Sequence, residues 1–564
     1  MRTPRAYRQP PPEFPDPRKL ARVSDSLDSR LRDSVYRWIT DDPDPASREE
    51  LTAVLARAMG KEPGAAEEIA DRMAGPLEFG TAGLRGPVRA GPNGMNVAVV
   101  TRTTAGVAAW LAAQGHAGGV VVVGRDARHG SEAFATAAAE VLTAAGFAVK
   151  VLPQPLPTPL LAFSVLHYGA VAGIQITASH NPPADNGYKL YDATGGQIVP
   201  PSDGEIERAI QSAPATRSIP RTPGAEVVDP REAYLSAVGA LPRGTTRELR
   251  IAATALHGVG AETLRAALAR AGFTDLHLVS AQSEPDADFP TVSFPNPEEP
   301  GATDLLLELA SEVDADLAVA LDPDADRCAL GVRGPDGWRM LRGDETGVLL
   351  GAHLLSTTDN PDPLVATTIV SSSLLGEVAK EKGARYAETL TGFKWLVRAG
   401  EGLVFAYEEA LGLCVNPSFV RDKDGIAAAV AGADLAATLK AEGRTLLDVL
   451  DDIATRHGVH LTDQVSLRVT DLSVRGRLMA ALRSDPPATL GGVPVTLEDL
   501  LPDADVLRLS GDGVRVVVRP SGTEPKLKAY LQVVAPVTGE LADARRGATE
   551  VLDAVREEIA ALLR

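Results

Sequence analysis

The chain has 564 residues, of which 44% are hydrophobic and 23% charged, the composition of an ordinary folded protein. Because a single hydrophobic core stops growing at roughly 250–300 residues, we expect about three to four domains. The formal net charge of −19 argues against a nucleic-acid partner, which would require a basic surface. An anionic substrate would need a local cationic pocket.

Two cysteines, Cys328 and Cys414, are too few for a disulfide framework and indicate a reducing compartment. No apolar run approaches the roughly 18 residues of a membrane span, and the N-terminus has no apolar core of a signal peptide. We therefore expect a cytoplasmic protein without a membrane partner. Nothing in the sequence decides between a monomer and a dimer.

From residue 118 the sequence alternates short β-rich apolar runs with helical patterns. Predicted strands cover 118–124, 147–152 and 170–177, and predicted helices cover 131–146, with Ser131 as N-cap, and 157–169. This βαβαβ order is typical of a largely parallel sheet covered by helices.

The same alternation of strands and helices begins again at 249–256 and includes a strand at 316–321. It begins a third time at 363–370, with later strands that end near Leu390 and Phe405. After about Val459 the pattern changes to scattered strands and a final helix. We predict an α/β protein of four domains, three similar with mixed, largely parallel sheets and a smaller C-terminal α+β domain. The predicted ranges are an N-terminal extension, partly helical or disordered, at 1–50, domains at 51–235, 236–345, 346–460 and 461–564, and linkers at 211–224 and near 343–347.

The strand at 170–177 leads directly into Thr177-Ala178-Ser179-His180-Asn181-Pro182. A serine on a turn at the carboxyl end of a parallel strand is exposed at the ligand-binding edge and can act as a nucleophile. Taken alone, Ser179 is more easily explained as a turn or capping serine.

The strand at 316–321 ends in Asp322-Pro323-Asp324-Ala325-Asp326-Arg327. Three carboxylates at alternate positions of an extended segment fall on one side, and hard oxygen ligands so arranged suit Mg²⁺. The alternative is a solvated acidic loop, which mutual repulsion makes the weaker explanation.

In the last domain, a strand at 514–520 leads into Arg519-Pro520-Ser521-Gly522-Thr523-Glu524-Pro525-Lys526. Arginine binds phosphate in a bidentate manner, the hydroxyls donate, and the glycine admits backbone N–H groups, so the segment is a candidate anion site. An ordinary hairpin turn is the alternative.

Other candidates are weaker alone. Glu408 and Glu409 follow a strand and could hold sugar hydroxyls, although such pairs are usually solvated. Lys189 and Lys394 could contact phosphate or transfer a proton. The remaining candidates are Arg85, in a glycine-rich segment at 80–86, and two histidines that could orient a neighbour or carry a proton, His180 and His257.

The segments FGTAGLRG (79–86), TASHNP (177–182), DPDADR (322–327), EEALG (408–412) and RPSGTEPK (519–526) together resemble the α-D-phosphohexomutase superfamily. The resemblance covers roughly residues 50–560, and it is to the branch with phosphoglucomutase, phosphomannomutase and phosphopentomutase-like enzymes. It implies four domains whose motifs meet in a central cleft.

The resemblance also implies residue roles. Ser179 would be the phosphoserine, and its phosphoryl oxygen would share one Mg²⁺ with Asp322, Asp324 and Asp326. Arg327 would support the same phosphoryl group and Glu408 would face the sugar. The distal phosphate would be held by Arg519, Ser521, Gly522, Thr523 and Lys526, proton transfer would fall to Lys189 or Lys394, and Arg85 and His180 would assist at the catalytic centre.

The expected reaction interconverts hexose 1-phosphate and hexose 6-phosphate, of glucose, mannose or both, through a bisphosphorylated sugar that also serves as activator. Phosphopentomutase and glucose 1,6-bisphosphate synthase activity stay open, because Ala410 replaces a serine frequent in the family and a sugar contact is lost. Pro323 replaces a frequent glycine, but the three carboxylates are present. A metal-dependent phosphatase with Asp322 as nucleophile and a non-catalytic sugar-phosphate sensor are more remote alternatives.

Overall fold

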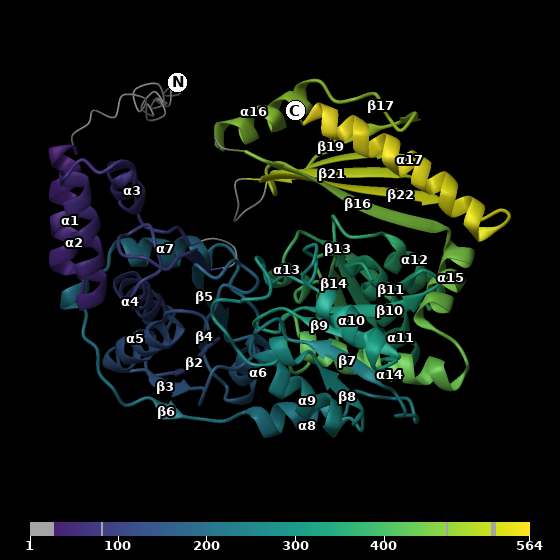
Figure 1. Ribbon diagram of the computed structural model, residues 1–564, viewed down its shortest axis with the longest axis horizontal. Coiled ribbons are helices and arrows are strands. Elements are labelled where there is room, and N and C mark those ends of the chain that lie inside the picture. The colour runs from purple at the N-terminus through teal and green to yellow at the C-terminus, as the bar shows by residue number, and fades with distance from the viewer. Residues whose placement is uncertain (1–26, 80–82, 470–471, 521–525, 564) are drawn as a thin grey trace, which may run out of the picture.

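The computed structural model describes residues 27–79, 83–469, 472–520 and 526–563. The described part of the chain begins with a helical group whose core includes Val35, Leu51 and Ile69 (Figure 1). Its helices are α1 (Ser29–Asp41), α2 (Pro45–Met59) and α3 (Ala65–Arg72). The predicted extension is therefore helical from Ser29, while residues 1–26 lie outside the described part.

The first unit (84–227) is a six-stranded sheet in the order β1-β5-β4-β2-β3-β6. Strands β2, β3, β4 and β6 are parallel, and β5 pairs antiparallel with both β4 and β1. Its elements are β1 (Leu84–Pro87), α4 (Val97–Ala113), β2 (Val120–Arg125), α5 (Ser131–Ala144), β3 (Ala148–Val151), α6 (Thr158–His167), β4 (Ala172–Ile176), β5 (Asp185–Asp192), α7 (Ser202–Gln211), η2 (Thr216–Ser218) and β6 (Glu226–Val227). The predicted βαβαβ order is confirmed. The predicted N-cap is wrong, because Gly130 occupies that position and the Ser131 hydroxyl instead donates to Asp126.

The second unit (231–340) has a five-stranded sheet in the order β11-β10-β9-β7-β8. Strands β7, β8 and β9 are parallel, and β10 pairs antiparallel with both β9 and β11. Its elements are α8 (Arg231–Gly239), β7 (Ile251–Thr254), α9 (Gly260–Arg270), β8 (Leu276–Leu278), η3 (Ser280–Gln282), α10 (Asp304–Glu312), β9 (Leu317–Leu321), β10 (Cys328–Gly334) and β11 (Gly337–Met340).

The third unit (343–457) has a four-stranded sheet in the order β13-β12-β14-β15, parallel except for β15. Its elements are α11 (Gly343–Thr357), β12 (Leu364–Thr368), α12 (Leu374–Glu381), β13 (Arg385–Thr389), α13 (Phe393–Leu396), β14 (Leu403–Glu408), β15 (Gly412–Cys414), α14 (Gly425–Ala441) and α15 (Leu446–His457). The linker predicted near 343–347 is wrong, because these residues are the first turn of α11. Gly343 serves close packing there, since a Cβ would lie 1.9 Å from the Glu409 carbonyl oxygen.

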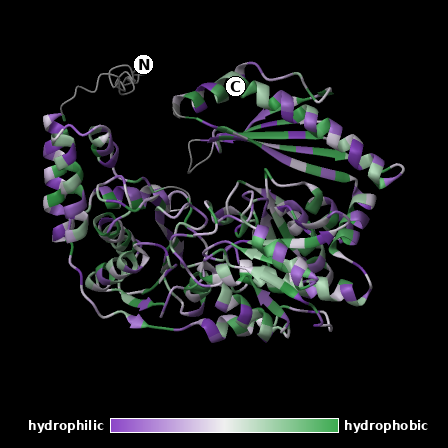
Figure 2. Cartoon of the chain, in the orientation of Figure 1, coloured by the Kyte–Doolittle hydropathy of each residue, from purple (hydrophilic) through white to green (hydrophobic). Residues whose placement is uncertain are grey.

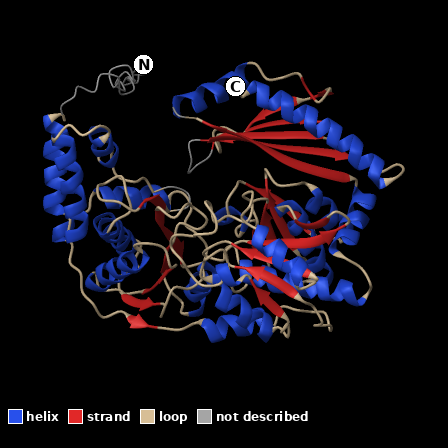
Figure 3. Cartoon of the chain, viewed as in Figure 1, coloured by secondary structure: helices blue, strands red, loops and turns tan. Residues whose placement is uncertain are grey.

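The fourth unit (459–563) is an antiparallel sheet in the order β16-β22-β21-β20-β19, with α16 and α17 on the side away from the third unit (Figure 3). Its elements are β16 (Val459–Arg468), α16 (Leu472–Ser484), β17 (Thr489–Leu490), β18 (Val493–Pro494), β19 (Thr496–Asp499), β20 (Leu507–Gly511), β21 (Val514–Pro520), β22 (Lys526–Ala535) and α17 (Leu541–Leu562). Hydrophobic and hydrophilic residues interleave along α17, as in a helix that covers one face of a sheet (Figure 2). The smaller α+β domain is confirmed.

The hydrophobic cores show how the units are joined. One continuous core runs from Val122 in the first unit through Val319 in β9 to Phe405 in the third. The fourth unit has a core of its own and meets the third through a small apolar cluster that includes Ile369 and Tyr530. The first three units thus form one packed body that positions the strand ends. Within the described residues, no helix combines the length and apolar character that crossing a membrane requires.

Candidate functional site

Loops from three sheets meet at the centre of the packed body. They follow β4, β9 and β14, and each lies at the carboxyl end of a parallel strand, where open α/β sheets bind ligands. The Ser179 hydroxyl donates to Asp322 Oδ2 at 3.0 Å, across 143 residues of sequence. An isolated bridge between Arg327 and Gly412 ties the aspartate loop to the loop that carries Glu408. The predicted convergence of these segments is therefore observed.

Ser179 occupies a sharp turn with a φ of +55°, a left-handed conformation that residues with a side chain rarely adopt. Its N–H donates to Thr177 Oγ1 at 2.9 Å, and its hydroxyl lies 3.2 Å from His180 Nδ1. Such strain costs on the order of 1–3 kcal/mol and persists only where the surroundings hold it. Only 1% of the residue is exposed, so the turn directs the hydroxyl at Asp322 rather than at bulk solvent.

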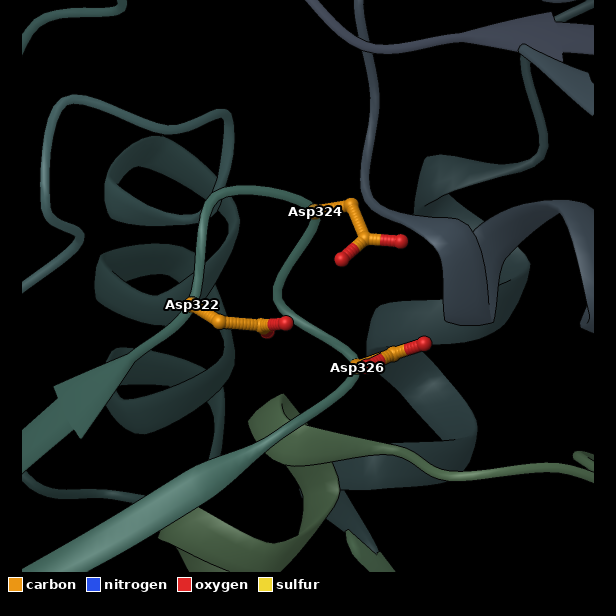
Figure 4. A group of neighbouring side chains, drawn as sticks. All are labelled: Asp322, Asp324 and Asp326. Carbon is orange, nitrogen blue, oxygen red and sulfur yellow. The ribbon is translucent and has the colours of Figure 1, made fainter. Parts of the chain in front are cut away.

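The three aspartates surround a tight turn (Figure 4). The extended segment predicted for them is wrong, because Ala325 has a φ of +55° and its N–H bonds back to the Asp322 carbonyl. The turn still brings the three carboxylates together, as the extended segment was expected to do. One carboxylate oxygen from each of Asp322, Asp324 and Asp326 lies within 4.8 Å of the others. All three are fully buried, which excludes the solvated acidic loop.

Two lysines neutralise much of this negative charge. Lys189 Nζ lies 2.7 Å from Asp324 Oδ2 and 2.8 Å from Asp326 Oδ2, and Lys423 Nζ lies 3.2 Å from Asp326 Oδ2. Burial alone would raise the pKa of Asp326, but the two lysines lower it below its usual value. Burial, with Asp326 and Asp324, raises the pKa of Asp322 well above its usual value. A further cation near Asp322 would relieve this cost.

The donor set fits a divalent metal ion. Asp324 Oδ1 and Asp326 Oδ1 are buried and have no hydrogen-bond partner among the described residues. Buried acceptors without a partner are costly, and a cation satisfies them. Hard carboxylate oxygens are the ligands that Mg²⁺ prefers. The triad can therefore hold a metal ion.

Cationic side chains surround the serine. The Arg327 guanidinium contacts His180 and lies 3.9 Å from both Asp322 and Glu408. Burial, together with Arg327 and Arg85, lowers the pKa of His180 well below its usual value, so the imidazole is neutral at pH 7. Arg85 Nη1 lies 3.4 Å from Asn181 Oδ1 in the serine loop. Arg85 therefore contacts the loop that carries Ser179, His180 lies beside the Ser179 hydroxyl, and Arg327 contacts His180.

The two glutamates after β14 have different surroundings. Glu408 faces Arg327, and burial raises its pKa. Glu409 points elsewhere and accepts hydrogen bonds from Thr368 Oγ1 at 3.2 Å and Ser371 Oγ at 2.9 Å. Burial, with Glu408, raises the pKa of Glu409 to about 7. Glu408 is therefore the one that shares the site with Arg327.

The predicted distal phosphate loop lies partly in the described part of the chain. Ser521, Gly522 and Thr523 fall outside the described residues, and Lys526 begins β22. Arg519 hydrogen-bonds the side chain of Tyr530, whose charged neighbours include Glu409 and Glu408. This end of the fourth unit therefore lies next to the glutamate loop of the third.

Sequence reasoning missed two cations that the structure places in the site. Lys423 follows β15 and packs over the Phe393 ring, 5.1 Å from its centroid, while contacting Asp326. Arg128 follows β2 and contacts the serine loop. The strand-end rule could have found Arg128, because β2 lies beside β4 in the sheet.

Two predicted candidates, Lys394 and His257, have hydrogen-bond and charge partners outside the aspartate triad. Lys394 Nζ packs over the Trp395 ring, its charged neighbours are Asp203 and Arg398, and burial lowers its pKa. His257 Nε2 lies 2.8 Å from Thr291 Oγ1, and burial lowers its pKa. Neither side chain makes a hydrogen bond or ion pair with the aspartate triad in the described ranges.

Four family models match the chain in succession. They are the phosphoglucomutase/phosphomannomutase alpha/beta/alpha domains I, II and III, at 76–217, 232–335 and 342–457, and the phosphoglucomutase/phosphomannomutase C-terminal domain at 476–543. The order and number agree with the three α/β units and the smaller fourth unit.

Individual proteins give the same result. A probable phosphomannomutase of Haemophilus influenzae is 42% identical over 78% of this chain and 93% of its own length. A probable phosphoribomutase of Schizosaccharomyces pombe is 33% identical over 94% of this chain and 98% of its own length. A solved structure from Thermus thermophilus, named as a candidate phosphomannomutase, is 25% identical with a TM-score of 0.69 and covers 86% of this chain and 99% of that one. The chain therefore belongs to the phosphoglucomutase/phosphomannomutase family of the α-D-phosphohexomutase superfamily and is an isomerase of the phosphosugar mutase class.

Proposed function

We propose that the protein interconverts hexose 1-phosphate and hexose 6-phosphate through a phosphorylated Ser179. The observation that carries the proposal is the 3.0 Å hydrogen bond from the Ser179 hydroxyl to Asp322 within a buried group of three carboxylates. A nucleophile, a metal-ligating group and cations in one buried site are what phosphoryl transfer requires.

In the first step, the bond between phosphorus and Ser179 Oγ breaks and a bond forms to the free hydroxyl of the sugar monophosphate. The proton of that hydroxyl passes to a side chain, and Ser179 Oγ keeps the bonding electron pair and takes up a proton to become a hydroxyl again. The sugar bisphosphate then turns around, and its other phosphoryl group is transferred to Ser179: the bond from phosphorus to the sugar oxygen breaks, a bond to Ser179 Oγ forms, and the sugar oxygen takes up a proton as the serine hydroxyl loses one. Added bisphosphate would act as an activator by restoring phosphoserine.

The chain's own residues have distinct tasks in this reaction. Arg327 places positive charge beside Ser179, as the transferring group requires. Burial alone would lower the pKa of Lys189, but Asp324 and Asp326 raise it, so Lys189 stays charged and acts as a fixed cation. Burial lowers the pKa of Lys394, the direction that a proton acceptor needs.

A metal ion would be held by Asp322, Asp324 and Asp326, with Ser179 completing the site through its phosphoryl oxygen. We propose Mg²⁺, because all the donors are hard oxygens. When bound, the ion would stabilise the negative charge that develops on the transferring group.

The sugar would lie between Glu408 and the fourth unit, where Arg519, Ser521, Gly522, Thr523 and Lys526 would hold the distal phosphate. The relative named as a phosphomannomutase supports a hexose substrate. A second candidate is a pentose phosphate, because the relative named as a phosphoribomutase aligns over 94% of this chain and 98% of its own length.

Phosphorus NMR on wild-type protein tests the proposal. Glucose 1-phosphate, mannose 1-phosphate and ribose 1-phosphate would be compared with Mg²⁺ and a trace of the matching bisphosphate. We expect migration of the phosphate between positions without free phosphate, fastest with a hexose. Stoichiometric release of phosphate would instead indicate a phosphatase, build-up of bisphosphate a synthase, and binding without turnover a sensor.

A further inference from the structure

Arg128 makes an unusual set of hydrogen bonds to the loop that carries Ser179. Its Nη2 donates to the carbonyl oxygens of Ser179 at 2.7 Å and Asn181 at 2.6 Å. Its Nη1 donates to those of Pro182 at 2.8 Å and Asp185 at 3.2 Å. One guanidinium therefore binds four backbone acceptors, three in the loop that carries Ser179 and one at the first residue of β5.

Arg128 is itself fixed from two sides. The Asp126 carboxylate accepts the backbone N–H of Arg128 at 3.0 Å and lies 3.4 Å from its Nε. On the other side, the guanidinium packs over the Phe289 ring, 4.9 Å from its centroid, and Phe289 belongs to the second unit. Only 4% of Arg128 is exposed, so its donors face the loop rather than water.

These hydrogen bonds give donors to the buried carbonyl oxygens of the serine turn. Ser179 has a left-handed backbone, and the carbonyls of Ser179, Asn181 and Pro182 all face the Arg128 guanidinium; buried carbonyls without donors are costly. The planar guanidinium offers donors in a rigid fork, whereas a lysine ammonium is a single point charge that cannot reproduce it. Arg128 touches the backbone of Ser179 and not its hydroxyl, in contrast to Asp322.

The same region links two units across the site. His129 Nε2 lies 2.7 Å from Asp288 Oδ1, next to the Phe289 ring under Arg128. The aspartate triad belongs to the second unit and Ser179 to the first. A residue that holds the serine loop and packs on the second unit therefore fixes the hydroxyl against the triad.

We infer that Arg128 is the positioning residue that holds the Ser179 turn and sets the place of its hydroxyl relative to Asp322, an inference that rests on the proposed function of Ser179. Because a displacement of about 1 Å at a reacting group can cost roughly 100-fold in rate, loss of Arg128 should lower kcat. KM should change little, because Arg128 does not reach the proposed sugar site.

The test compares Arg128→Gln and Arg128→Lys with the control Arg125→Gln. Arg125 is a half-buried arginine three residues earlier, and its side chain contacts Asp126 and Glu132 but makes no hydrogen bond or ion pair with the serine loop among the described residues. We expect kcat to fall about 100-fold in Arg128→Gln and only partly to recover in Arg128→Lys, with KM within about threefold of wild type. In Arg128→Ala, added guanidinium ion at non-denaturing concentration should restore part of the kcat, which a merely structural role would not predict.

A second measurement does not depend on activity. Hydrogen exchange of amides 178–186 should accelerate by roughly tenfold or more in Arg128→Gln while the rest of the first unit exchanges as in wild type. Phe289→Leu, which keeps the arginine but removes the ring, should show a smaller effect in the same segment. Unchanged exchange together with unchanged kcat would overturn the inference, as would a loss of activity that only follows the loss of folded protein. If the wild type lacked mutase activity, the proposed function would fail while the exchange result still decided whether Arg128 holds the turn.

Discussion

The Ser179 hydroxyl and the Asp322 carboxylate lie 3.0 Å apart although 143 residues separate them in the chain. Ser179 belongs to the first unit and Asp322 to the second. The contact exists because both residues follow parallel strands whose carboxyl ends face the same region between the units.

Replacing Ser179 with alanine should abolish both turnover and phosphoprotein formation, because the atom that carries the phosphoryl group is removed. We expect a loss of at least about 10³-fold, measured by coupled assay and by intact-protein mass spectrometry. Ser164→Ala is the matched control, since Ser164 is also a buried serine of the first unit but its hydroxyl bonds only the Leu160 carbonyl among the described residues. Undiminished turnover in Ser179→Ala would remove the serine from the mechanism.

Removing divalent metal should stop turnover, and adding Mg²⁺ should restore it. A metal ion that binds only the folded state also stabilises that state, by about 2.7 kcal/mol when the free metal concentration is roughly 100 times the Kd. Thermal unfolding with and without Mg²⁺ should therefore show a shift in wild type that Asp324→Asn diminishes. Asp314→Asn, at an exposed aspartate paired with Arg333, should keep the full shift. An equal shift in both variants would place the metal elsewhere.

Lys189→Met should make folding depend on metal. Removing one partner of a buried ion pair costs about 3–5 kcal/mol, because Asp324 and Asp326 lose their nearest cation. A bound divalent ion would compensate part of that charge, so denaturant unfolding should show a large loss of stability in chelator and a smaller one in Mg²⁺. The control is Lys150→Met, a half-buried lysine paired with Glu226 in the first unit. A loss that is the same with and without Mg²⁺ would contradict this account.

Glu409→Gln should change the pH dependence of stability. The pKa of Glu409 is raised from 4.5 to about 7 in the folded state, so between these values the unfolded chain ionises while the folded chain stays protonated. Ionisation then favours unfolding, and wild type loses stability as pH rises through this window and no further above it.

The variant lacks this titration, so its stability relative to wild type should grow by about 1–3 kcal/mol between roughly pH 4.5 and pH 7.5. Chemical denaturation at several pH values measures the difference. Glu401→Gln, on an exposed turn of the third unit, should run parallel to wild type. Parallel curves for Glu409→Gln as well would show that the carboxyl titrates normally.

Much of the fold followed from local pattern. Apolar runs such as 170–177 and 316–321 are buried strands because hydrophobic side chains of that length fit a sheet covered on both faces, and the structure has β4 and β9 there. Where a prediction from local pattern was wrong, tertiary packing explains the difference. Gly343 was expected to be part of a linker, but it begins α11 and packs against the Glu409 backbone, which leaves no room for a side chain.

The sequence by itself determined which residue types stand at strand ends, and so identified Ser179, the three aspartates and Arg327 as candidates. Only the tertiary structure decided that Lys189 contacts the triad while Lys394 lies beside Trp395, and that Lys423 and Arg128 join the site. The physical reason is that charge pairing and hydrogen bonding act over about 3 Å in space. These partners come from units that are far apart in the sequence. Their separation in sequence does not show which of their side chains come within that distance of one another in the folded protein.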